Sequence, residues 1–146
     1  MKRLLVLAAC LLPLASAHAY CVHNDLASRE VRLSSQLGGR GTLQMTLRPG
    51  EKFCCAPKDT ECNPEGKITS NLDLEVAVLD KPEYRCGIED RSGAILKITG
   101  GGTARVVPNP KAKSALPYVV RVRAQDGRDV SGPSGVACHE FKQKGN

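Results

Sequence analysis

Cysteine is the residue type in this chain whose number and placement suggest the clearest chemistry. Seven cysteines occur among 146 residues, and one of them, Cys10, lies in an apolar N-terminal segment with the layout of a cleaved secretory leader. The other six are Cys21, Cys54, Cys55, Cys62, Cys86 and Cys138. An even number of cysteines in an exported chain predicts a set of structural disulfides.

The vicinal pair Cys54 and Cys55 guides the prediction of which cysteines bond. Neighbours in an extended strand point to opposite sides, so Cys55 should face the core with Phe53 while Cys54 faces outward, although a bulge at Phe53 would exchange the two. From these inward and outward orientations we expect the bridges Cys55–Cys86, Cys54–Cys62 and Cys21–Cys138. A vicinal Cys54–Cys55 bridge is a strained alternative, and the spacing of cysteines and histidines does not match the two close ligand pairs of a zinc site.

The N-terminal segment predicts where the protein resides. Lys2 and Arg3 precede an apolar stretch and a run of small residues, so we expect residues 1–19 to be removed as a signal peptide. Residues 20–146 should then form a single domain in the periplasm or outside the cell. A lipoprotein anchored at Cys10 is the alternative. No later segment approaches the roughly 20 apolar residues of a transmembrane helix, so we expect no membrane span.

A second cleavage point would give the mature chain a histidine at its N-terminus. Cutting after Ala17, rather than before Tyr20, releases His18, whose amine and imidazole could bind one metal ion together. His23 or His139 could complete a nitrogen-rich copper site, whereas otherwise we expect no cofactor. The segment around His18 resembles the cleavage region of the small copper-resistance carrier proteins and of the lytic polysaccharide monooxygenases. That resemblance implies copper bound at the N-terminus, but six cysteines depart from both families.

The elements that would position these residues are short strands. Apolar residues alternate with polar ones in four segments, which is typical of strands with one buried face: 31–37, 43–47, 72–78 and 118–122. Four weaker candidates are 84–88, 94–99, 103–107 and 136–141. Glycine and proline turns separate these segments, and no helical period lasts three turns. We therefore expect an all-β fold of about 7–9 strands, a small antiparallel β-sandwich that is immunoglobulin-like in general shape.

Composition argues against nucleic-acid binding and against catalysis. The formal charge is +6, of which the leader supplies two, and the basic residues are scattered among acidic ones. Aromatic residues make up 3% of the chain and tryptophan is absent, so few rings could stack on bases. The segment 132–135 contains Ser134 but reads as a turn rather than as a nucleophile elbow. We expect a protein that binds and is not an enzyme.

The predicted function is that of an exported binding module. Two loops should present the binding surface, Lys58–Gly66 and Pro108–Pro117, because a disulfide at Cys62 would hold the first loop in place and so reduce the ordering cost of binding. The candidate contact residues are Lys58, Asp59, Glu61, Lys111 and Lys113. The expected partner is an envelope or extracellular protein or an anionic polymer.

Overall fold

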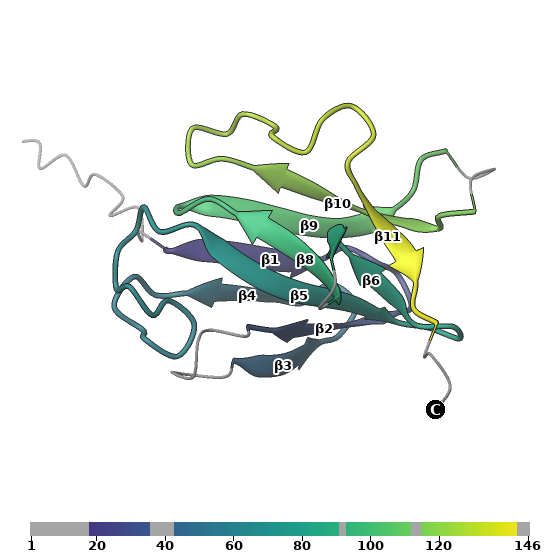
Figure 1. The fold of residues 1–146 in the computed structure, drawn as a ribbon, viewed down its shortest axis with the longest axis horizontal. Helices are drawn as coiled ribbons and strands as arrows, with labels where there is room; N and C mark the ends of the chain where they lie inside the picture. Colours follow the sequence, from purple (N-terminus) through teal and green to yellow (C-terminus); the bar gives the residue numbers. More distant parts are fainter. Residues whose placement is uncertain (1–17, 36–42, 91–92, 112–114, 143–146) are drawn as a thin grey trace, which may run out of the picture.

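The computed structural model describes residues 18–35, 43–90, 93–111 and 115–142 (Figure 1). Within these ranges the chain forms eleven strands and no helix, which confirms the all-β class. The strands are β1 (Tyr20–Asn24), β2 (Glu30–Ser34), β3 (Gln44–Leu47), β4 (Lys52–Cys55), β5 (Leu72–Leu79), β6 (Tyr84–Cys86), β7 (Ile88–Asp90), β8 (Gly93–Ile98), β9 (Gly102–Pro108), β10 (Tyr118–Arg123) and β11 (Val136–Glu140). Lys113 and residues 1–17 of the predicted signal peptide, which include Cys10, lie outside the described residues.

The number of strands exceeds the expected range, partly because Gly87 divides one predicted strand in two. Gly87 has a φ of 139°, and a Cβ atom there would lie 2.3 Å from the backbone of Ile95. Only glycine allows both this conformation and this close approach. The chain therefore leaves β6 at Gly87 and begins β7, which pairs with β8.

The strands form one continuous sheet that folds over on itself. We call β4, β1, β9 and β10 the β1 half, and β3, β2, β5 and β6 the β5 half, in the order in which neighbours are paired. Strand β11 connects the halves, because Val136 and Ala137 pair with β10 whereas its last three residues pair with β6. The result is nearly closed and barrel-like, not two clearly separate layers.

Two features of the sheet differ from the expected antiparallel sandwich. The first is its continuity through β11. The second is the pairing of β1 with β9, which is parallel, with Tyr20 opposite Gly102 and Asn24 opposite Val106. Alternation within a strand indicates which residues face the core, but it carries no information on the direction of the neighbouring strand. The antiparallel prediction is wrong at this pair.

The core is aliphatic and follows the alternation of the sequence. In β5 the apolar residues at positions 72, 74, 76 and 78 are buried, whereas Asp73 is exposed. The same pattern buries Val22 in β1 and Val106 in β9. Tyr20 is the largest fully buried side chain. With so few aromatic residues to bury, a small core depends on additional covalent links for stability.

All six described cysteines form disulfides, but the three predicted partners are wrong. The observed bridges are Cys21–Cys54, Cys55–Cys62 and Cys86–Cys138. The predicted facing was correct in part, because Cys55 is buried while Cys54 is half-buried. Strand register decides the partners: Cys21 lies directly opposite Cys54 in the β1–β4 pair, and Cys86 lies directly opposite Cys138 in the β6–β11 pair. The side of the sheet to which each cysteine points does not determine which residue lies opposite it in the neighbouring strand.

The three disulfides indicate an oxidising environment outside the cytosol. They differ in exposure, since Cys21 and Cys54 are half-buried whereas the other four cysteines are buried. Within the described ranges, no helix has the length and apolar character needed to cross a membrane.

Candidate functional site

The outer face of the β1 half carries basic residues in one line across four strands. Lys52 on β4 lies opposite His23 on β1, His23 lies opposite Arg105 on β9, and Arg105 lies opposite Arg121 on β10. We call these four residues the basic row. The residues that flank them along each strand, such as Val22 and Val106, are buried, so the pleat directs the basic row away from the core.

A second line of residues runs beside the basic row. It contains Cys54, Cys21 and Thr103, and it ends at Arg123 on β10. Arg123 is exposed. The same outer face therefore carries the half-buried disulfide and a further cation next to the basic row.

Acidic side chains neutralise only part of this face. Arg105 forms a bidentate pair with Asp25, with its Nε 2.6 Å and its Nη2 3.2 Å from the two carboxylate oxygens. Arg121 lies 3.8 Å from Asp129. The side chain of the exposed Lys52 makes no hydrogen bond or ion pair with any other described residue.

Arg121 is also held by the segment that follows β10. It donates hydrogen bonds to the carbonyl oxygens of Gly132 and Pro133, at 2.9 and 3.1 Å. The two lines thus contain four formally positive arginine and lysine side chains, and two carboxylates from outside the lines, Asp25 and Asp129, pair with them. These two lines therefore carry an excess of positive charge on the outer face of the β1 half.

His23 lies at the centre of this charge. Burial lowers the pKa of His23 below its ordinary value, and the neighbouring cations Arg105 and Lys52 lower it further, while Asp25 acts in the opposite direction. A neutral imidazole therefore separates Lys52 from Arg105 near neutral pH. The repulsion within the basic row is smaller than four formal charges would produce.

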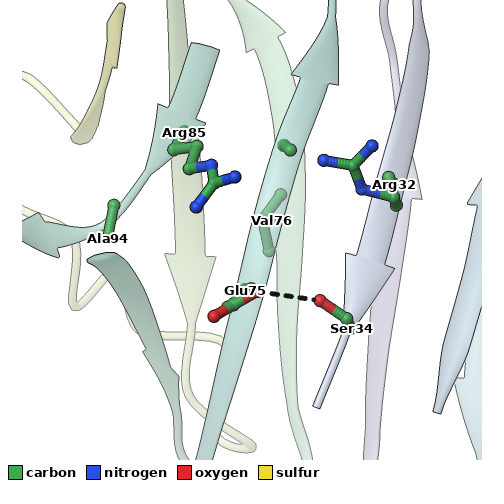
Figure 2. Close-up of a pocket in the computed structure, with 7 residues that line it drawn as sticks. Arg32, Ser34, Glu75, Val76, Arg85 and Ala94 are labelled. Atoms are coloured by element: carbon green, nitrogen blue, oxygen red, sulfur yellow. Dashed lines mark hydrogen bonds between the residues drawn. The ribbon is translucent and has the colours of Figure 1, made fainter. Parts of the chain in front are cut away.

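The outer face of the β5 half also carries two arginines, but there carboxylates surround them. Arg32 on β2 and Arg85 on β6 lie on either side of Ala77 in the same register line, and their guanidinium groups approach each other over β5 (Figure 2). They line a shallow pocket with Ser34, whose hydroxyl donates to Glu75 at 3.1 Å. The small side chain of Ala77 leaves the space that the pocket occupies.

Glu83 links the two arginines of this pocket. Its carboxylate accepts two hydrogen bonds from Arg32 at 3.0 Å and one from Arg85 at 3.1 Å. Arg85 also stacks over Phe141, with its guanidinium carbon 3.5 Å from the ring centroid, a favourable cation–π geometry. With Glu75 nearby, two carboxylates offset two arginines. The pocket is therefore close to neutral, and its charges hold strands together.

The predicted binding loops lie at opposite ends of the molecule and do not form one surface. The loop after β4 and the loop after β9 leave opposite ends of the parallel β1–β9 pair (Figure 1). Lys58, Asp59 and Glu61 are exposed, and the Cys55–Cys62 bridge closes their loop. Lys111 lies 3.4 Å from the hydroxyl of Ser134. A binding role for either loop stays a prediction.

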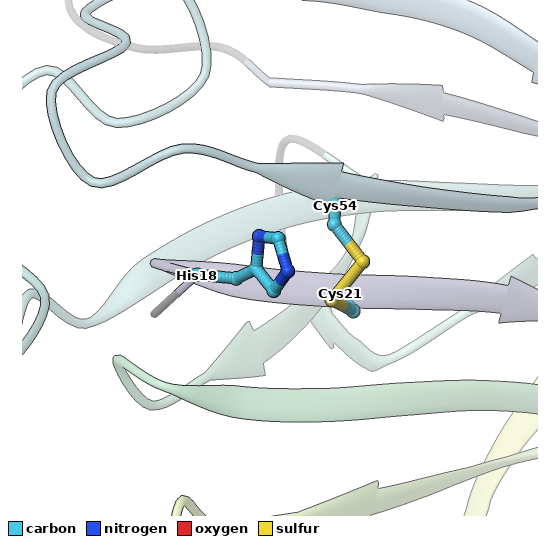
Figure 3. Close-up of side chains that lie close together, drawn as sticks. All are labelled: His18, Cys21 and Cys54. Carbon is cyan, nitrogen blue, oxygen red and sulfur yellow. A yellow bond between two sulfur atoms is a disulfide. The ribbon is translucent and has the colours of Figure 1, made fainter. Parts of the chain in front are cut away.

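The structure does not bring the three histidines of the predicted copper site together. His23 lies on the β1 half, whereas His139 lies opposite Arg85 on β11. Among the residues that the structure describes, the only group of three side chains able to hold one metal ion is His18 with Cys21 and Cys54 (Figure 3). In that group the two cysteines are bonded to each other.

Sequence reasoning missed the basic row because its members are far apart in the chain. Each member occupies a polar position of an alternating strand, which is a detectable signal. Their alignment requires the parallel pairing of β1 with β9, and no pattern in the sequence indicates that pairing. No known protein family, curated protein or solved structure matches this chain.

Proposed function

We propose that this protein is an exported, disulfide-stabilised binding module that takes an anionic polysaccharide on the outer face of its β1 half. The observation that carries the proposal is the basic row together with its neighbour Arg123. Their four cations, Lys52, Arg105, Arg121 and Arg123, outnumber the two carboxylates that pair with them. The three disulfides support an exported protein. The two halves would face each other as the layers of a sandwich do, leaving this outer face open to a ligand.

The shape of the basic row suits a linear polymer. Its four members span three strand spacings, or roughly 14 Å at about 4.8 Å per strand. A polymer lying across the strands would bring negative groups to Lys52, Arg105 and Arg121, and it would pass over the neutral imidazole of His23 between the first two. Lys52 is available directly, and Arg105 would exchange its contact with Asp25 for one with the ligand.

The chemistry of this face favours a polysaccharide over an acidic protein. Stable protein interfaces depend on buried aromatic or large apolar anchors. The two lines of outward residues contain none, and the large apolar side chains that are exposed in the described chain, Ile88 and Val130, belong to neither line. A repeating anion requires no such anchor, because charge pairing supplies the attraction and weakens with salt.

The proposed role is binding and not catalysis. The pocket on the β5 half holds a serine that donates to Glu75 and two arginines that share Glu83. Its lining includes no histidine that could act as a general base toward Ser34. The arrangement supports a structural role for these side chains.

The test measures binding of the purified exported protein to immobilised polygalacturonate, heparin and neutral dextran. We expect binding to the first two polymers and not to dextran, with an affinity that falls as salt rises. The double substitution Lys52→Glu with Arg123→Glu should weaken binding at least about tenfold, equivalent to 1.4 kcal/mol. A preference between polygalacturonate and heparin would distinguish carboxylate from sulfate recognition.

The matched control is Lys67→Glu with Lys81→Glu, which makes the same change in net charge at two exposed positions outside both lines. This control should bind as the natural protein does. Equal losses in the two double variants would mean that net charge alone attracts the polymer. That result, or an absence of binding to either anionic polymer, would overturn the proposal.

A further inference from the structure

His18 lies beside the disulfide on the outer face of the β1 half. One imidazole nitrogen of His18 and the sulfur atoms of Cys21 and Cys54 all lie within 4.8 Å of one another (Figure 3). Imidazole nitrogen and two thiolates are ligands that Zn²⁺ prefers. The disulfide prevents this use, because the thiolate and not the bonded sulfur is the metal ligand.

This disulfide is the one that a reductant would reach first. Cys21 and Cys54 are half-buried, whereas relative exposure is 0% for Cys86 and Cys138. Cys55 and Cys62 are buried as well. Thiol–disulfide exchange requires access to a sulfur atom, so limited reduction should open the Cys21–Cys54 bridge while the other two bridges persist.

The sheet would keep the two sulfurs together after reduction. Cys21 and Cys54 are directly opposed in the antiparallel β1–β4 pair, with the pairs Tyr20–Cys55 and Val22–Phe53 on either side. Two zinc–sulfur bonds of 2.3 Å in a tetrahedral site place the sulfurs about 3.8 Å apart. Opposed residues of an antiparallel pair can provide that separation without rearrangement of the strands.

We propose that reduction of the Cys21–Cys54 bridge creates a Zn²⁺ site formed by His18 and these two cysteines. A dithiol reductant, such as a thioredoxin-like protein, would supply two electrons and two protons and become a disulfide itself, while the bridge becomes two thiols. Zinc binding then displaces the two thiol protons. The two thiolates cancel the charge of the ion, so binding adds no net positive charge to a face that is already basic.

The site requires that the mature protein retains His18, and the fold supports this. Ala19 is fully buried in the core cluster. Its N–H donates to the carbonyl of Cys55 at 2.8 Å, and its carbonyl accepts from the N–H of Gly101 at 2.6 Å. A chain that begins at Tyr20 would lose both hydrogen bonds and leave a buried space empty. Cleavage after Ala17 keeps them and adds the α-amine of His18 as a fourth ligand.

The first experiment measures the mass of the exported protein and maps its reduction. The mass should correspond to a chain that begins at His18 with three disulfides. After brief treatment with a phosphine reductant and alkylation, the label should appear first on Cys21 and Cys54. A chain beginning at Tyr20, or labelling that begins at Cys86 and Cys138, would overturn the proposal.

The second experiment titrates the partly reduced protein with Cd²⁺, followed by thiolate-to-metal charge-transfer absorption, and then displaces Cd²⁺ with Zn²⁺. We expect one ion per chain after reduction and no charge-transfer absorption in the oxidised protein. His18→Ala should weaken binding at least about tenfold, since even outer-shell partners of a metal ligand contribute that much. His139→Ala is the matched control and should leave the affinity unchanged.

The comparison of oxidised with reduced natural protein needs no variant, so it stays informative if a substituted chain fails to fold. Cys21→Ser with Cys54→Ser should abolish binding under reducing conditions. Equal cadmium binding before and after reduction would overturn the proposal, as would an unchanged affinity in His18→Ala. Neither result bears on the polysaccharide proposal, because Lys52 and Arg123 are not ligands of this site.

Discussion

The two outer faces of the sheet use the same residue types in opposite ways. On the β5 half, Arg32 and Arg85 share the carboxylate of Glu83, and one of them stacks on an aromatic ring. On the β1 half, Arg105 is paired with Asp25 but Lys52 makes no ion pair within the described chain. Charges that are satisfied within the fold hold strands together, whereas unsatisfied charges remain for a ligand. The comparison predicts that carboxylate pairing, and not net charge alone, decides which face binds the proposed polymer.

The largest difference between the halves should appear when one disulfide is removed from each. Cys86–Cys138 and Cys21–Cys54 both join directly opposed residues, but their sequence separations are 52 and 33, and only the first bridge is fully buried. Loop closure and the cavity left by buried sulfur together predict a loss of about 5 kcal/mol for Cys86→Ala with Cys138→Ala, and of about 3.5 kcal/mol for Cys21→Ala with Cys54→Ala. Urea unfolding measures both values, and a larger loss for the exposed bridge would contradict the burial argument.

The disulfides also show how much of this fold the sequence predicts. Alternation correctly predicted the buried face of β5 and the inward orientation of Cys55. Pairing depends on register between distant segments, and residues that share a face, such as Cys55 and Cys86, need not lie opposite each other. The basic row was not predicted from the sequence for the same reason. Its members are outward residues, which alternation indicates, but their alignment depends on a parallel strand pair.

The next prediction removes one carboxylate from each face. Glu83→Gln leaves two half-buried arginines without a shared anion and should lower the free energy of unfolding by about 1–2 kcal/mol. Asp25→Asn affects a more exposed pair and should cost about 0.5 kcal/mol or less. Asp25→Asn should also strengthen binding to polygalacturonate, because it releases Arg105. Denaturant unfolding measures the two changes in stability, and the polymer assay measures the change in binding.

Glu83→Gln also tests whether the two outer faces differ only in how their arginines are paired. In a chain whose β1 half is inactivated by Lys52→Glu with Arg123→Glu, adding Glu83→Gln should restore part of the polymer binding by freeing Arg32 and Arg85. Restoration would show that carboxylate pairing, and not position in the fold, determines which face binds. If binding stays absent although the variant folds, the shape of the β1 half must matter as well as its charge.

The smallest expected effect concerns two carboxylates that respond differently to acid. The pKa of Asp80, at the end of β5, is lowered by the hydroxyl of Tyr118 and by Arg29, whose Nε lies 2.9 Å from its Oδ1. The pKa of Asp129, beside the β1 half, is lowered chiefly by the hydroxyl and backbone N–H of Ser131. Each carboxylate therefore binds protons more weakly in the folded chain than in the unfolded chain.

The difference between the folded and the unfolded pKa of each carboxylate gives the sign of the pH dependence. A lowered folded pKa contributes stability that is complete above the unfolded value of about 3.9 and is lost as pH falls through the folded pKa. Asp80→Asn should therefore reduce stability at neutral pH and flatten its decline below about pH 4. Asp129→Asn should do so less, because its main partner is a neighbour in the same turn, which the unfolded chain keeps close. Thermal unfolding from pH 3 to 7 measures both slopes, and equal flattening would show that the long-range contact of Asp80 with Tyr118 adds nothing beyond a local turn.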